Sequence, residues 1–140
     1  MKWIGPYKTD ELLDGMMTDS HPKPPPANSV YVISQRSWQD APTFECIPLY
    51  VGSNTSTSQR FRTRVGDLIA DMFGFFTTET GHHSGGQSLH QFCKEHGVNP
   101  RNLYIGWVQH CECPRCLENK VYNGLKPRLN RNKPAKCKKH

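Results

Sequence analysis

With 140 residues, 35% of them hydrophobic, and a net charge of +6 at pH 7, the chain suits a single domain with one modest core. No apolar run reaches the roughly 18 residues that a membrane-spanning helix needs. Acidic residues and a Gly-Pro pair interrupt the N-terminal stretch, so no signal peptide is expected. We therefore expect an intracellular, cytoplasmic protein, whose six cysteines are thiols or metal ligands rather than disulfides.

The first 28 residues are expected to be an arm, because the four prolines in HPKPPPAN (21–28) exclude a helix or a central strand. The β-branched and aromatic run SVYVIS (29–34) predicts a strand. CIPLYVG (46–52) predicts its antiparallel return strand, and Pro48 places that strand at a sheet edge or lies among its first residues.

Two helices and a third strand are expected next. Apolar residues at positions 61, 65, 68, 69 and 72 form a stripe that predicts a helix, with Ser56 and Gln59 at capping-box spacing at its start. Arg60 and Arg64 are four residues apart and share another face of this helix. The spacing predicts a short helix from about residue 88 to 96 that stops at a glycine. The segment NLYIGWVQH (102–110) predicts the third strand.

The C-terminal part of the chain is expected to form a last helix and a basic tail. CPRCLENKVYNGL (113–125) has a helical pattern, with Pro114 in its first turn. Seven Lys and Arg and no acid lie between residues 126 and 140, whereas eleven bases face twelve acids elsewhere. The tail at 131–140 therefore favours a polyanionic partner such as nucleic acid. The alternative is a solvated tail that serves only solubility.

Four sequence features together resemble the GIY-YIG nuclease domain: SVY at 29–31, YVG at 50–52, Arg60 eight residues past that glycine, and LEN…LKPRLN at 117–130. The resemblance covers residues 29–130. It implies an α/β (α+β) fold with a small three-stranded antiparallel sheet flanked by helices. It also implies a metal-dependent endonuclease, a hydrolase that cuts DNA phosphodiester bonds with one Mg²⁺ or Mn²⁺ ion.

The resemblance implies a role for each matching residue. Glu118 would bind the metal ion, and the planar guanidinium of Arg60 would clamp the scissile phosphate. Tyr31 or Tyr50 would orient or deprotonate the attacking water, and the sequence leaves open which of them does so. Phosphate or DNA contacts are expected from four further residues: Arg64, Lys126, Arg128 and Asn130.

The chain departs from the family pattern at two positions. Ser29 stands where the first motif usually has glycine, and Arg64 stands where several family members have a histidine. His83, in the loop GHHSGG, is the expected replacement for that histidine in catalysis. The alternative is a flexible surface loop, which Gly85 and Gly86 favour.

Cysteines near the last helix are candidate zinc ligands. The pair Cys113-x-x-Cys116 has the spacing of a metal hook, and a structural zinc site needs four ligands. The expected remaining ligands are Cys111 and Cys137, with His110 and His140 as alternatives. Free thiols are the competing interpretation. Two other cysteines lie in apolar patterns and are expected in the core: Cys46 and Cys93.

Two other functions remain open. A module of the same fold could bind nucleic acid without cutting it, stabilised by zinc, or a zinc-stapled domain could use its basic tail on an acidic protein. The motif set favours the endonuclease, because binding alone does not require a carboxylate beside a phosphate. DNA is the expected partner and no membrane is involved; RNA stays open as a substrate. A homodimer is one arrangement that would allow both strands to be cut.

Overall fold

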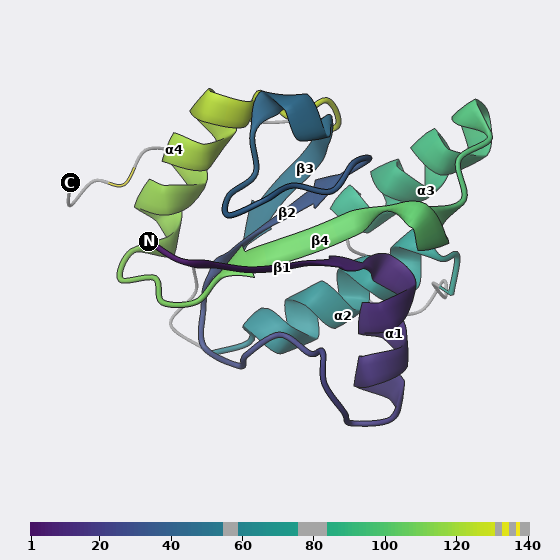
Figure 1. The fold of residues 1–140 in the computed structure, drawn as a ribbon, viewed down its shortest axis with the longest axis horizontal. Helices are drawn as coiled ribbons and strands as arrows, with labels where there is room; N and C mark the ends of the chain where they lie inside the picture. Colours follow the sequence, from purple (N-terminus) through teal and green to yellow (C-terminus); the bar gives the residue numbers. More distant parts are fainter. Residues whose placement is uncertain (55–58, 76–83, 131–132, 135–136, 138–140) are drawn as a thin grey trace.

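The computed structural model of the chain describes residues 1–54, 59–75, 84–130, 133–134 and 137. These residues form a mixed α/β fold with one antiparallel sheet, in the strand order β1-β4-β2-β3 (Figure 1). The strands are β1 (Trp3–Lys8), β2 (Val30–Ser34), β3 (Pro48–Ser53) and β4 (Tyr104–Val108). The α-helices are α1 (Thr9–Met17), α2 (Phe61–Met72), α3 (Ser84–His96) and α4 (Pro114–Leu125). Two short 3₁₀ turns occupy Phe44–Cys46 and Pro100–Asn102.

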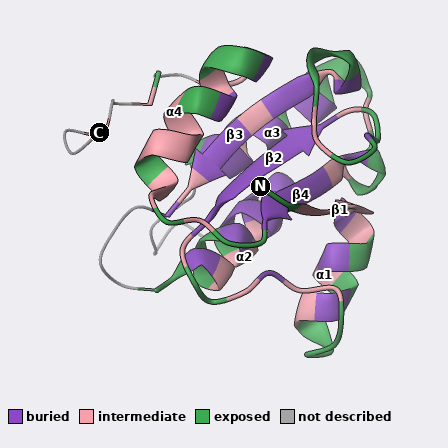
Figure 2. Ribbon diagram, turned by 60° about the vertical axis from the view of Figure 1, so that its left-hand side comes forward, coloured by how far each residue is buried: buried purple, intermediate pink, exposed green. Residues whose placement is uncertain are grey.

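Side chains alternate between the two faces of the sheet, as expected for a strand covered on both sides. In β2, Tyr31 and Ile33 pack in the larger core with helices α1, α2 and α3. Val30 and Val32 point the other way, into a smaller core with Trp38 and α4. All five residues of β2 are buried, so the centre of the sheet is enclosed by two layers (Figure 2).

The sheet has four strands, and the expectation of three was wrong because residues 3–8 of the expected arm pair with β4. Their register shifts between Ile4 and Tyr7, a stretch that contains Pro6. Proline lacks an N–H and is tolerated on edge strands and at bulges. Helix α1 follows directly, and its Leu12 is fully buried in the larger core. Most of the expected arm is therefore part of the fold.

Helix α2 matches its predicted pattern. In α2 the apolar stripe is buried as expected: Phe61, Val65, Leu68, Ile69 and Met72. The helix begins at Phe61, later than a helix capped at Ser56 would, and Ser56 lies outside the described residues. The side chain of Gln59 instead accepts a hydrogen bond from the Asn28 N–H at 2.9 Å.

Helix α3 starts at Ser84, about one turn earlier than predicted, because two glycines belong to the helix and not to a loop. A Cβ on Gly85 would lie 2.4 Å from Cζ of Tyr50, and one on Gly86 would lie 2.7 Å from the Leu68 carbonyl oxygen. Only residues without a side chain allow α3 to approach β3 and α2 so closely. His83 and the rest of 76–83 lie outside the described residues.

After α4 the chain runs back along β3. Lys126 ends the helix in the left-handed conformation, with φ 51°. The Arg128 N–H donates to the Pro48 carbonyl at 3.2 Å, and the Leu129 N–H donates to the Leu49 carbonyl at 2.7 Å. Residues 128–130 therefore cover the free edge of β3, the edge strand predicted from Pro48.

No helix within the described residues is both long enough and apolar enough to cross a membrane.

Candidate functional site

A cavity of about 270 Å³ lies where β3, α3, α4 and the segment after α4 meet. Three residues predicted from the sequence line it: Tyr50 from β3, Glu118 from α4, and Asn130. The other lining residues are Ser84, Gly85, Ser88 and Leu129. Tertiary structure therefore brings together side chains that come from positions 50 to 130 of the chain.

The two motif tyrosines are neighbours but occupy different environments. Their ring centroids lie 6.1 Å apart. Tyr31 is 1% exposed, and its ring packs against Phe61 with a centroid distance of 5.9 Å. Tyr31 pairs across the sheet with Gly52, where an added Cβ would lie only 2.3 Å from the tyrosine Oη. The glycine of the YVG motif thus makes room for the Tyr31 ring, whereas Tyr50 borders the cavity.

Both phenols are neutral at physiological pH. Burial raises the pKa of Tyr31 well above its usual value, and the neighbouring Tyr50 adds to this shift. Burial also raises the pKa of Tyr50, as does the negative charge of Glu118. The positive charge of Arg64 lowers the pKa of both tyrosines. Tyr50 therefore offers the cavity a hydroxyl group rather than a phenolate.

Glu118 is held at the edge of the sheet by a side-chain hydrogen bond. The hydroxyl of Ser53, the last residue of β3, donates to Oε2 of Glu118. Burial raises the pKa of the Glu118 carboxyl, against the Ser53 hydrogen bond and the positive charge of Arg115, which both lower it. Among the described residues, no base forms an ion pair with this carboxylate. The carboxylate of Glu118 is thus partly buried and hydrogen-bonded to Ser53.

Asn130 has a structural role at the site. Its Oδ1 accepts from the Val51 N–H at 2.9 Å, and its Nδ2 donates to the Val51 carbonyl at 2.8 Å. The side chain therefore extends the cover over the β3 edge by one more residue. This hydrogen-bonding supports the wall of the cavity that carries Tyr50.

None of the four predicted basic residues lines this cavity. Arg60, at the N-cap of α2, and Arg64, one turn further, are both exposed. Arg128 lies over the Phe92 ring, 5.3 Å from its centroid, in an adjoining cavity of about 530 Å³ that shares Ser88 with the first cavity. Lys126 is exposed and lines neither of these cavities.

Ser53 is a site residue that the sequence reasoning did not select. It directly follows the YVG motif, so its place at the end of a strand was available from the pattern. Its contact with Glu118 spans 65 residues and could not be read from local sequence.

Three of the four expected zinc ligands lie together. The Sγ atoms of Cys113, Cys116 and Cys137 all lie within 4.8 Å of one another and could hold a metal ion such as zinc. Cys111 is not a member of this group. His140 lies outside the described residues. Cys46 and Cys93 are buried core residues, as expected.

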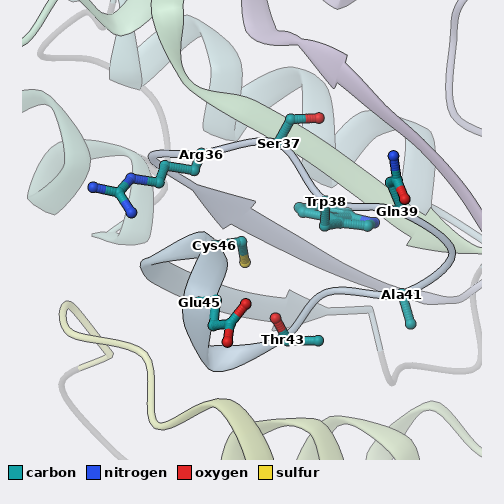
Figure 3. A pocket seen from close by; sticks show the side chains of 8 residues that line it. All are labelled: Arg36, Ser37, Trp38, Gln39, Ala41, Thr43, Glu45 and Cys46. Atoms are coloured by element: carbon teal, nitrogen blue, oxygen red, sulfur yellow. The ribbon is translucent and has the colours of Figure 1, made fainter.

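A larger cavity, of about 580 Å³, lies in the loop between β2 and β3, where Arg36, Trp38 and Glu45 are among its lining side chains (Figure 3). No site residue predicted from the sequence lines it. The catalytic hypothesis therefore concerns the smaller cavity.

Comparisons of the chain with protein-family models, curated proteins and solved structures find no match. The resemblance to the GIY-YIG nuclease domain therefore stays a prediction from the motifs. The fold and the geometry of the cavity are the basis for the proposal that follows.

Proposed function

We propose that the chain is a metal-dependent endonuclease that hydrolyses DNA phosphodiester bonds with a single metal ion, in the manner of GIY-YIG nucleases. The observation that carries the proposal is that Tyr50, Glu118 and Asn130 line one cavity. These three residues were predicted from the sequence motifs alone. A shared cavity is the arrangement that a joint catalytic role requires.

The lining of the cavity suits a hard divalent cation. Glu118 supplies its one carboxylate, and Tyr50, Ser84 and Ser88 supply hydroxyl groups. Mg²⁺ prefers oxygen ligands and is commonly held by one or two carboxylates with several waters. When bound, such a cation would stabilise negative charge on the phosphate and on the leaving oxygen.

The residues of the chain itself would bind and orient the reactants. The neutral Tyr50 hydroxyl can hydrogen-bond the attacking water. The Ser53 hydroxyl fixes the orientation of the Glu118 carboxylate. Arg60 and Arg64, exposed at the start of α2, can reach phosphate oxygens from solvent. Preorganised charge of this kind stabilises the transition state of phosphoryl transfer.

The test is cleavage of supercoiled plasmid in Mg²⁺ or Mn²⁺. We expect nicking by the wild type that stops in EDTA. Glu118→Gln keeps the size of the side chain and one oxygen that can accept from Ser53, but it removes the charge, so the rate should fall at least about 100-fold. Glu11→Gln, an exposed change on α1, is the matched control and should cleave at the wild-type rate.

Other outcomes would change the assignment. If wild type and Glu118→Gln cut no DNA or RNA but both bind DNA with salt-sensitive affinity, the chain is a nucleic-acid-binding module. Cleavage that survives in Glu118→Gln would remove this residue from the reaction. Circular dichroism spectra of both proteins would show that the variant is folded.

A further inference from the structure

We propose that Cys113, Cys116 and Cys137 form a structural zinc site that fastens the basic tail to the start of α4. The Sγ atom of Cys113 lies 3.1 Å from that of Cys116 and 3.5 Å from that of Cys137. Cys137 lies 24 residues further along the chain than Cys113. A segment distant in sequence therefore brings a third thiol to the Cys-x-x-Cys pair.

The sulfur separations suit a tetrahedral metal ion. With Zn–S bonds of about 2.3 Å, two sulfurs of a regular tetrahedron lie about 3.8 Å apart. The Cys113–Cys137 separation of 3.5 Å is about 0.3 Å shorter than that, and the Cys113–Cys116 separation of 3.1 Å is about 0.7 Å shorter. They are well above the roughly 2.05 Å of a disulfide bond. Thiolates are soft ligands that select zinc over Mg²⁺, so this site and the carboxylate cavity would take different metals.

The local structure orients the cysteine pair. Cys113 is the N-cap of α4, and Pro114 occupies the first helical position. Proline fixes the backbone there without loss of a helical hydrogen bond. Cys116 then lies one turn into the helix, where its sulfur faces that of Cys113. The pair therefore lies at the start of a helix, with both sulfurs on the same side.

A second contact holds the tail beside α4. The Asn119 side-chain amide donates to the Pro134 carbonyl at 2.8 Å. Asn119 and Cys116 are three residues apart and lie on neighbouring positions of the helix surface. The tail therefore contacts α4 at both Pro134 and Cys137.

Two residues beside the cluster are available for the fourth position. Cys111 and His110 line a cavity of about 440 Å³ together with Cys113 and Cys116. Either side chain provides a ligand atom that zinc accepts.

The site also bears on catalysis, and this step rests on the proposed function. Glu118 is two residues past Cys116 on the same helix. Zinc would fix the start of α4 and so the position of the carboxylate. The zinc ligands would then be positioning residues, since none of them lines the cavity.

The first test is the metal content of the full chain, purified under reducing conditions and measured by mass spectrometry. We expect about one zinc per chain in the wild type and in Cys93→Ala, whose thiol lies in the core away from the cluster. Cys113→Ser and Cys116→Ser should hold less than a tenth of that amount. Cobalt in place of zinc should give the intense absorption of tetrahedral thiolate coordination in the wild type, and Cys137→Ser should weaken it.

Limited trypsin digestion after Arg131 tests the fastening of the tail, since trypsin does not cut the Lys133–Pro134 bond. We expect Cys137→Ser, and wild type treated with a zinc chelator, to be cut there at least about tenfold faster than zinc-loaded wild type. Cys93→Ala should be cut at the same rate as the wild type. Circular dichroism spectra of all the proteins separate this effect from unfolding.

The zinc proposal is overturned if the reduced wild type holds no zinc, or if zinc survives in Cys113→Ser. A Cys113–Cys116 disulfide in place of metal would also overturn it. The fastening is overturned if chelation leaves trypsin cleavage unchanged. Metal content and trypsin cleavage are measured without DNA, so they test the zinc site independently of the proposed endonuclease activity. Loss of plasmid cleavage in Cys137→Ser, with Mg²⁺ present and circular dichroism unchanged, would support the positioning role of zinc.

Discussion

The side-chain amide of Asn130 makes hydrogen bonds to both the N–H and the carbonyl of Val51, at 2.9 and 2.8 Å. It thereby takes the place of a backbone peptide unit from a neighbouring strand. Val51 is buried, so water does not readily replace these bonds. Asn130 therefore stabilises the edge of the sheet as well as lining the cavity.

Asn130→Ala should lower the free energy of unfolding by about 1–3 kcal/mol, because it leaves two backbone groups of a buried residue without partners. Urea denaturation followed by circular dichroism measures this change. Asn123→Ala is the control, since Asn123 is exposed and bonds only to Asn119 on its own helix. A loss as small as in the control would show that water satisfies Val51.

Gly52→Ala should lower the free energy of unfolding by about 1–3 kcal/mol through overpacking. The new Cβ would lie 2.3 Å from the Tyr31 hydroxyl oxygen, in a fully packed part of the core. Gly124→Ala is the matched control, because nothing lies within 4 Å of a Cβ there and the residue is on helix α4. It should instead raise stability by about 0.5–1 kcal/mol. Thermal and urea unfolding measure the change in the free energy of unfolding of each variant, which should be negative for Gly52→Ala and positive for Gly124→Ala. Equal changes in the two variants would contradict the packing argument.

Tyr50→Phe should slow plasmid cleavage by about 100-fold or more, the usual loss when a positioned proton-handling group is removed. Tyr31→Phe should slow it less than about tenfold, because the Tyr31 side chain is buried and does not line the cavity. Single-turnover rates in Mn²⁺, with circular dichroism as a fold check, compare the two. A larger loss in Tyr31→Phe would assign the water-orienting role to the buried tyrosine.

The thiol of Cys93 should make stability depend on alkaline pH. Burial raises its pKa from 9.0 to about 11. Between these values the unfolded chain has released a proton that the native chain keeps, so the free energy of unfolding falls as pH rises. The difference in stability between wild type and Cys93→Ala should thus be constant below pH 9 and shift against the wild type above it. Urea unfolding at pH 8 to 10.5 under reducing conditions measures this, and a difference that never changes with pH would contradict it.

The strands and helices with a clear period were predictable from sequence. The alternating residues of β2 and the apolar stripe of α2 each show which side chains share one face of the element. Those side chains could therefore be predicted to pack together in a core. Strand β1 was missed because Gly5 and Pro6 interrupt its pattern. Its pairing depends on a partner about one hundred residues away, and an irregularity in the register accommodates the proline.

Within the candidate site, residue types were predictable but distances were not. The motifs selected Tyr50, Glu118 and Asn130, which share the cavity. They did not distinguish Tyr31, which packs in the core, from Tyr50. The glycine-rich sequence also predicted a loop at Gly85, although this residue belongs to α3 and packs against the Tyr50 ring. Such close approaches depend on tertiary packing and leave no local signal.

Residues 128–130 cover the edge of β3, and this has a consequence for folding during synthesis of the chain. Its hydrogen bonds join residues 79 or 80 apart, and contacts of such long separation slow folding. While the chain is being synthesised, the elements from β1 to α3 emerge before β4 and α4, so they lack both β4 and the walls that α4 supplies. A ribosome that stalls before residue 118 releases a chain with the Tyr50 wall but without the carboxylate. Whatever the cavity binds, it can do so only once translation has passed Asn130.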